Sequence, residues 1–180
     1  MPSIHDLTIP AFRRGLAILA NYVDKAADYS AAEGLASGAL IDARLASDML
    51  TFTGQIQRAS DNAKSGAARL AGVEAPSFPD VETDFQDLRQ RLADTDAFLA
   101  GLTPEQFDRA EIRVIELGFR SVSGTMSGQI YLTQVLLPNF YFHIATAHGI
   151  LRAAGVAIGK RDYIGTTDDG SGVWRLSLLA

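Results

Sequence analysis

Apolar residues recur at helical spacing in four segments of this chain. In the first segment, from Phe12 to Ala26, they follow one another at alternating intervals of four and three residues. This alternation places them on one face of a helix, which Thr8 would cap and Pro10 would open in its first turn. The later segments repeat the pattern and are bounded by glycine and proline. The sequence therefore predicts four helices, near residues 8–29, 47–71, 82–101 and 128–154.

The fourth segment is apolar over most of its circumference. Two stripes run along it, one with Leu132, Leu136, Phe140, His143, Ala147, Ile150 and Ala154, the other with Tyr141, Ile144, His148 and Leu151. Such a helix needs cover on more than one side. Pro138 predicts a kink, because proline cannot donate a hydrogen bond to the Gln134 carbonyl. Either the packing tolerates that kink, or the kink opens space beside Asn139 and His143.

The segments between the helices complete the predicted architecture. Residues 30–46 form a long connection, and residues 75–79, with the sequence Ala-Pro-Ser-Phe-Pro, form a rigid turn. The β-rich segments 112–117 and 122–126 suit a short antiparallel hairpin. The predicted fold class is therefore all-α, an antiparallel four-helix bundle with a small β-hairpin before the last helix.

Composition and charge narrow the class of protein. The chain has 180 residues, 47% of them hydrophobic, and no cysteine, which fits one globular domain without disulfides or thiolate metal sites. Its net charge of −5 argues against nucleic-acid binding, which needs a basic face. No apolar run approaches the ~18 residues of a membrane span. The N-terminal residues lack a basic region and an apolar core, so we expect a cytoplasmic protein.

Of the three histidines in the chain, His143 is the candidate for chemistry. It lies on a predicted buried stripe, so it is either a neutral core imidazole with a hydrogen-bond partner, or a metal ligand or general base facing a pocket. His148 follows five residues later, points in a different direction on a helix, and is expected to be packed or interfacial. His5 lies in an N-terminal segment that is expected to fray, and it receives no role.

A pocket is predicted between the second and fourth helices. The second helix carries Thr53 and Ser60 where a core helix would carry Leu or Ile, which serves either close helix packing or a polar pocket wall. A buried His143 needs a hydrogen-bond partner, and the side-chain amide of Asn62 can supply one. The candidate ligand-binding residues are therefore Asn62, Asn139 and His143.

Several short segments resemble a bacterial family of uncharacterised proteins, a domain of unknown function, within the DinB-like superfamily. They are Asp6–Pro10 with Phe12 and Gly15-Leu16, Asp61–Lys64, Pro138–His143 and Gly159–Tyr163. The resemblance begins near residue 4 and implies a DinB-like helical bundle domain over residues 1–165, followed by a C-terminal extension at 166–180. It implies a four-helix bundle with a long crossover connection, and a homodimer.

The same resemblance bears on metal binding. Many members of the superfamily hold a divalent metal with three histidines, one from the second helix and two from the fourth. Some are metal-dependent thiol transferases or maleylpyruvate-type isomerases. In relatives similar to this chain, the position of Asn62 is often His, and His143 matches a ligand position. Because this chain has no histidine pair at helical spacing four, we expect no metal cofactor. The alternative is zinc or nickel held by His143 with Asn62.

Two functions follow from these observations. The first is an uncharacterised DinB-like protein that binds a small molecule and keeps a degenerate metal site. The alternative is a metal-dependent enzyme, of the thiol transferase or isomerase type, that uses His143 with a reduced ligand set. The Tyr141 side of the fourth helix needs a cover, either a second subunit or the hairpin and the C-terminal tail. We expect a homodimer with the fourth helix near its interface, and neither nucleic acid nor a membrane as partner.

Overall fold

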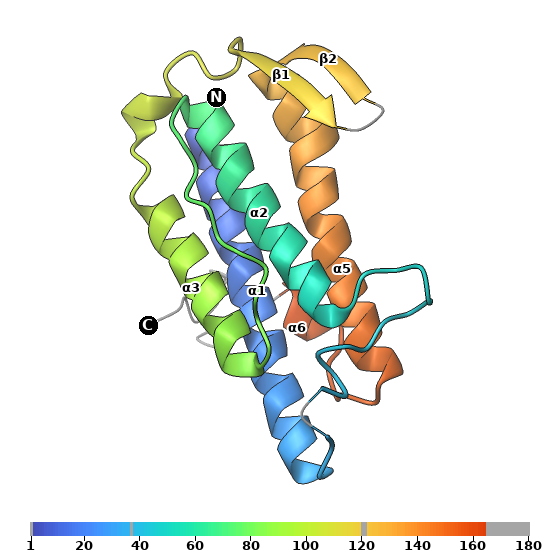
Figure 1. The fold of residues 1–180 in the computed structure, drawn as a ribbon. Helices are drawn as coiled ribbons and strands as arrows, with labels where there is room; N and C mark the ends of the chain where they lie inside the picture. Colours follow the sequence, from blue (N-terminus) through green and yellow to red (C-terminus); the bar gives the residue numbers. More distant parts are fainter. Residues whose placement is uncertain (1, 37, 120–121, 165–180) are drawn as a thin grey trace.

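The computed structural model describes residues 2–36, 38–119 and 122–164, and four long helices lie side by side in it (Figure 1). They are α1 (Ile4–Ala32), α2 (Phe52–Ala71), α3 (Phe85–Ala100) and a fourth helix made of α4 (Gly128–Ile130), η2 (Tyr131–Leu136) and α5 (Leu137–Ala153). The remaining elements are the short helices η1 (Pro104–Phe107) and α6 (Lys160–Ile164) and the strands β1 (Val114–Phe119) and β2 (Val122–Ser127). The strands pair antiparallel, with Val114 opposite Ser127. The predicted four-helix bundle with a hairpin before the last helix is confirmed.

The first helix begins four residues earlier than predicted. Ser3, not Thr8, is its N-cap, and Ser3 and Asp6 exchange hydrogen bonds of 3.0 and 3.1 Å in a capping box. Pro10 therefore lies inside the helix rather than in its first turn. The expectation of a frayed N-terminus around His5 is wrong, because His5 belongs to the first turn and its ring packs edge-on against Phe107, 5.2 Å between centroids.

The connection between α2 and α3 runs along the bundle instead of turning back at once. Residues 72–84 descend beside α2, so that α2 and α3 point the same way and α1 and α5 point the other way (Figure 1). The predicted rigid turn at residues 75–79 is thus part of the long crossover. It is held to α2 by a hydrogen bond of 2.7 Å from Gln57 to Glu82 and by the ion pair between Arg58 and Asp80.

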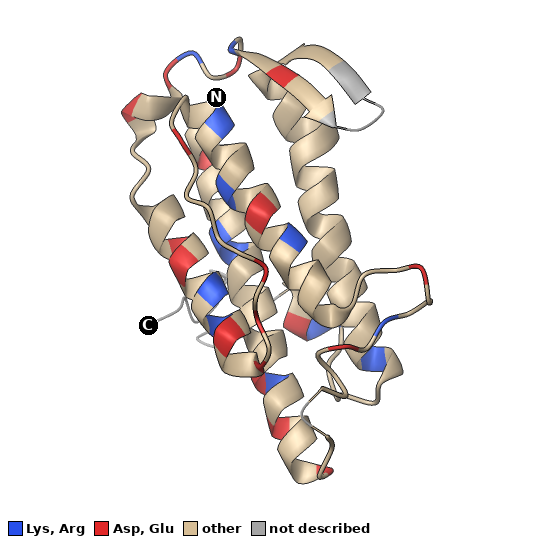
Figure 2. Cartoon of the chain, viewed as in Figure 1, with Lys and Arg blue, Asp and Glu red and all other residues tan. Residues whose placement is uncertain are grey.

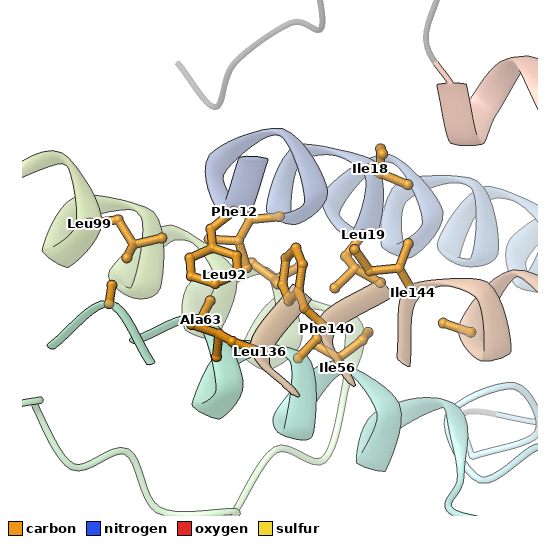
Figure 3. Packing of buried hydrophobic residues seen from close by; sticks show 14 of the residues in the cluster. Phe12, Ile18, Leu19, Ile56, Ala63, Leu92, Leu99, Leu136, Phe140 and Ile144 are labelled. Atoms are coloured by element: carbon orange, nitrogen blue, oxygen red, sulfur yellow. The ribbon is translucent and has the colours of Figure 1, made fainter. Parts of the chain in front are cut away.

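The fourth helix packs closely against both α1 and α2. Phe12 and Phe140 meet edge-to-face with 4.8 Å between ring centroids at the centre of the core (Figure 3). A Cβ atom at Gly15 of α1 would overlap the Phe140 ring, and a Cβ atom at Gly66 of α2 would overlap Leu136. Glycine at these two positions therefore permits the close approach of the helices on either side of the fourth helix.

The second apolar stripe of the fourth helix is covered within the chain. Tyr22 of α1 bonds His148 through its hydroxyl, 2.8 Å from Nδ1, and the ring of Tyr163 in α6 packs edge-on against the same imidazole. Lys25 and Asp162 tie α6 to α1 at 2.6 Å. The extension predicted at 166–180 lies outside the described residues. Within the described ranges, no helix is long and apolar enough to cross a membrane.

Candidate functional site

A cavity of about 420 Å³ lies between α2 and the fourth helix. Its walls are Arg58, Asp61, Asn62, Ser65 and Arg69 on α2, and Tyr131, Val135, Leu136, Asn139 and His143 on the fourth helix. The three predicted site residues therefore lie around one cavity. Asn139 is exposed at its rim, whereas Asn62 and His143 are half-buried. That the cavity binds a ligand stays a prediction.

The α2 wall of the cavity is a polar stripe beside the apolar face of that helix. Arg58, Asn62, Ser65 and Arg69 follow one another at intervals of four, three and four residues, which places them on one helical face. Figure 2 shows charges of both signs along α2, whereas the fourth helix has no Asp, Glu, Lys or Arg before Arg152. The charged residues of the cavity lining thus all come from α2, and the fourth helix supplies uncharged ones.

Thr53 and Ser60, for which helix packing and a pocket wall were the alternatives, bond parts of the chain away from the cavity. Thr53 donates to the Ile41 carbonyl at 3.1 Å. Ser60 shares a hydrogen bond of 2.7 Å with Thr95 of α3. Of the two alternatives, packing therefore holds for Ser60, Thr53 fastens the connection before α2, and neither residue lines the cavity. The regular spacing of the polar residues at 58, 62, 65 and 69 is the signal that identifies the correct face.

A widened turn precedes α5 at the cavity. In η2 the backbone bonds reach five residues back, and the Leu137 N–H donates to the Leu132 carbonyl. Pro138 follows immediately, in the first turn of α5. Because proline has no N–H for the Gln134 carbonyl, this bonding pattern accommodates a residue that would clash in an unbroken α-helix. The predicted distortion at Pro138 takes the form of a π-turn.

The protonation state of His143 follows from its neighbours. The Gln55 side-chain nitrogen donates to the Leu50 carbonyl at 3.3 Å, so Oε1 of Gln55 is the atom that faces the imidazole. His143 Nδ1 lies 2.8 Å from that oxygen and is therefore the protonated nitrogen, which leaves Nε2 with its lone pair. The predicted partner, Asn62, is not the group that binds this ring nitrogen; the sequence offered no periodic signal for buried Gln55.

Burial and the nearby charge of Arg58 lower the pKa of His143 from its ordinary value of 6.5 to about 4. The imidazole is therefore neutral at pH 7. A group with this pKa is a weak general base at neutral pH, because efficient proton transfer needs a pKa near the working pH. His143 is better suited to accept a hydrogen bond through Nε2.

Asn62, also a lining residue, has a buried side-chain oxygen. That oxygen accepts no hydrogen bond from the part of the chain that the structure describes. An orphaned buried polar group costs about 1–3 kcal/mol. Asn62 thus carries an acceptor atom without a partner behind the cavity wall, while His143 Nε2 is the acceptor that the tautomer leaves on the cavity residues.

The charged part of the wall belongs to an ion-pair network. Asp61 lies 3.0 Å from each of three cationic side chains, Arg58, Lys64 and Arg91, which neutralise its carboxylate. Arg69 donates to the Tyr131 hydroxyl at 3.3 Å near the other end of the cavity. The lining therefore contains one carboxylate shared among three cations, the guanidinium of Arg58, which Asp61 and Asp80 share, and that of Arg69.

These residues do not fit a divalent metal ion. Across the described ranges, no three His, Asp or Glu side chains come together as a metal site. Zinc favours three or four strong donors, whereas this cavity offers one imidazole and neutral amides beside two guanidinium groups. The only carboxylate in the lining, that of Asp61, is held by three cations. No chemistry of the site is therefore assigned to a metal.

Comparison with known proteins gives one family and one fold. The chain matches the family model described as "Domain of unknown function (DUF1993)" over residues 4–164. It is similar in structure to a DinB family member protein from Shewanella denitrificans, with 36% sequence identity, a TM-score of 0.86, and 92% of this chain and 93% of that chain covered. No curated protein matches the chain. The family match includes every residue of the cavity wall.

Proposed function

The chain belongs to the DUF1993 family of domains of unknown function and has the fold of a DinB family member, and from this premise we propose that it is a small-molecule-binding bundle that works without a metal. The binding site is the cavity between α2 and the fourth helix. One observation carries the proposal, the cavity of about 420 Å³ into which polar side chains from both helices converge. Small-molecule sites in proteins have volumes of roughly 300–1,000 Å³.

Binding is favoured over catalysis by the chemistry of the lining. A neutral His143 with a pKa of about 4 is poorly matched to proton transfer at pH 7. The carboxylate of Asp61 is engaged by three cations and so is a poor base or nucleophile. The alternative, a metal-dependent enzyme built on His143, draws support from the Gln55 contact, because metal-bound histidines are oriented by such a bond on their other nitrogen. The cavity lining, however, offers no further strong donors that would complete a metal site with His143.

The first experiment measures metal and ligand on the same preparation. Elemental analysis of protein purified without added ions should find no stoichiometric zinc or nickel. A ligand-observed NMR screen of small acids, amides and amines should then find compounds that bind. Ser65→Phe places a ring in the cavity and should abolish that binding. Ser47→Phe, at an exposed position in the connection between α1 and α2, is the matched control and should leave it unchanged.

Two results would count against the proposal. About one metal ion per chain would transfer preference to the metal-dependent enzyme. Compounds that bind equally well to wild type, Ser65→Phe and Ser47→Phe would place the binding site elsewhere. Thermal melting of each variant, measured in parallel, distinguishes a blocked cavity from a protein that has lost its fold.

A further inference from the structure

A second cavity, of about 400 Å³, lies beside the N-terminal end of α1. Ile4 and Leu7 of α1 form one wall, and Leu132 and Thr133 of the fourth helix form the other. Leu7 is 43% exposed, so part of a large apolar side chain meets water there. Apolar side chains gathered around a hollow on the surface indicate a place where another segment or molecule binds.

Two hydroxyl groups of this lining already have partners within the chain. The Ser3 hydroxyl accepts from the Asp6 backbone N–H at 3.1 Å, and the Thr133 hydroxyl donates to the Gln129 carbonyl at 2.9 Å. Among the described lining residues, Glu111 alone is charged, and it is exposed. The cavity therefore suits an apolar occupant that brings a cationic side chain to the side of Glu111.

The described part of the chain ends on the face of α1 that carries this cavity. Tyr163 of α6 packs against His148 of α5, and Arg14 of α1 donates to the Tyr163 and Ile164 carbonyls at 3.2 and 2.5 Å. Leu7 precedes Arg14 by seven residues, or two helical turns. It therefore lies on the same face of α1, about 10 Å further along.

The sequence after Ile164 has the length and composition to reach and fill the cavity. Residues 165–172 contain Gly, Thr, Asp and Ser, as linkers do, and eight extended residues span up to roughly 26 Å. Residues 173–179 read Val-Trp-Arg-Leu-Ser-Leu-Leu, so that apolar Trp174, Leu176 and Leu178 alternate with Arg175 and Ser177. Such alternation gives an extended segment one apolar side.

We propose that residues 173–179 of the same chain bind in this cavity, with their apolar side against Leu7 and Leu132 and Arg175 near Glu111. The occupant is the chain's own segment because a short tether gives an effective concentration in the ~mM range, well above that of a second copy at micromolar concentration. The proposal is independent of the cavity between α2 and the fourth helix.

Trp174 reports on this binding directly, because it is the only tryptophan in the chain. In the full chain at pH 7, its fluorescence should lie at shorter wavelength than in the urea-unfolded chain. Acrylamide should quench it severalfold less in the folded chain, because a buried ring is shielded from the quencher. The quenching constant should not change on tenfold dilution from micromolar protein.

Three variants assign the shielding to the cavity. Leu7→Asp introduces a charge that the apolar segment would have to bury, so quenching should rise to near the unfolded level. Leu35→Asp, at a similarly exposed leucine beyond the other end of α1, is the matched control and should leave quenching unchanged. Thr133→Glu, at an exposed position on the opposite wall, should act like Leu7→Asp. It carries the test if circular dichroism shows that Leu7→Asp has lost its fold.

Variants of the segment itself give the reciprocal test. Leu176→Asp should expose Trp174 to the quencher, whereas Ser177→Asp, on the polar side of the alternation, should not. Because Leu7 and Leu176 act through one contact, the two aspartate changes combined should raise quenching no further than either change alone.

Three results would overturn the proposal. Equal quenching of Trp174 in the folded and unfolded chain would mean that the segment does not bind. Shielding that survives both Leu7→Asp and Thr133→Glu would place the segment on another surface. Shielding that is lost on dilution would assign the occupant to a second copy. None of these results bears on the proposed function, which concerns the other cavity.

Discussion

At the scale of single residues, the site depends on a short chain of hydrogen bonds that ends at His143. The Leu50 carbonyl orients the amide of Gln55, and that amide in turn fixes which nitrogen of His143 carries the proton. Gln55 is buried, so its two bonds are not in competition with water. The backbone of the connection before α2 therefore determines the hydrogen-bonding character of a side chain on the fourth helix.

The protonation of His143 is directly measurable. Nitrogen-detected NMR of the imidazole should show the proton on Nδ1 at pH 7 and a pKa of about 4. Because the unfolded chain takes up this proton near pH 6.5 and the folded chain only near 4, the free energy of unfolding should fall as pH decreases through this window. His143→Gln should flatten that part of the stability curve. A pKa above 6, or a proton on Nε2, would contradict the hydrogen-bond assignment.

Gln55 gives a second test at this scale. Gln55→Leu leaves the Nδ1 proton of His143 without its acceptor, and we expect a loss of about 1–3 kcal/mol in the free energy of unfolding. Gln86→Leu, at an exposed position on α3, is the matched control and should have little effect. Urea denaturation of both variants decides the comparison. Equal losses in the free energy of unfolding would mean that the bond between Gln55 and His143 does not stabilise the fold.

At the scale of elements, the crossover of residues 72–84 is fastened to the bundle by charge. Arg91 of α3, almost fully buried, bonds Glu82 at 2.7 Å and the Pro79 carbonyl at 3.2 Å. The same guanidinium reaches Asp61 of α2 at 3.0 Å. One arginine thus joins two helices to the segment that connects them. Because α2 and α3 run parallel, this segment must span the length of the bundle, and these bonds hold it there.

Acidification should loosen this fastening. Burial raises the pKa of Glu82, but the hydrogen bonds from Arg91 and Gln57 outweigh burial and hold it below its ordinary value. A carboxyl with a lowered folded pKa stabilises the fold above its unfolded value of 4.5, and this stabilisation is lost as pH falls through the folded pKa. Glu82→Gln should therefore lower stability at pH 7 and reduce the difference in melting temperature between pH 7 and pH 3. An unchanged pH dependence would refute the role of Glu82.

The close approach of α1 and α5 gives a second element-scale prediction. Gly15→Ala pushes a methyl group into the ring of buried Phe140, and such overpacking costs about 1–3 kcal/mol. Gly149→Ala is the matched control within a helix, because its methyl group meets the exposed Leu45, which can move aside. The control should be neutral or stabilising, since alanine favours helix more than glycine does. Chemical denaturation with equal effects for both variants would contradict the packing argument.

The elements that follow from periodicity were predictable, and the links between them were not. Heptad-like stripes locate the helices because each stripe buries its own face, whatever the topology. The role of residues 72–84 depends on ion pairs with Arg58 and Arg91, which no periodic pattern in the sequence marks. For the site, Asn62, Asn139 and His143 lie around one cavity, and their role in binding stays a prediction. Gln55 was missed, because its partner lies on another helix.

At the scale of the whole molecule, the homodimer stays a prediction, but the surface that supports it is a different one. The stripe expected to need a second subunit is covered by α1 and α6 through Tyr22 and Tyr163. A different apolar surface lies on the outer side of α5. Phe142 is 55% exposed there. Leu45, in the connection between α1 and α2, is 47% exposed and lies beside Gly149. This surface keeps the fourth helix near the expected interface.

Light scattering at micromolar concentration should therefore give twice the mass of one chain. Phe142→Asp should shift the protein toward monomer, because a buried unpaired charge at an interface is costly. Val81→Asp, at an exposed apolar position in the crossover, is the control and should leave the mass unchanged. A wild-type mass equal to one chain would refute the dimer, and equal behaviour of the two variants would refute this interface.

The π-turn at residues 131–136 also decides how the cavity wall responds to insertion and deletion. A helix with such a turn carries one residue more than a regular helix of the same length. Because the wide turn absorbs that residue, deleting one residue here would restore regular winding and leave the parts on either side in register. Deleting one residue of α5 between Leu137 and Phe142 would instead rotate the preceding part by about 100° relative to the following one. Tyr131 would then turn away from Arg69, while His143 would keep its place beside Gln55. The place of a one-codon change along the fourth helix would thus decide whether a family member keeps this cavity wall or exchanges half of it.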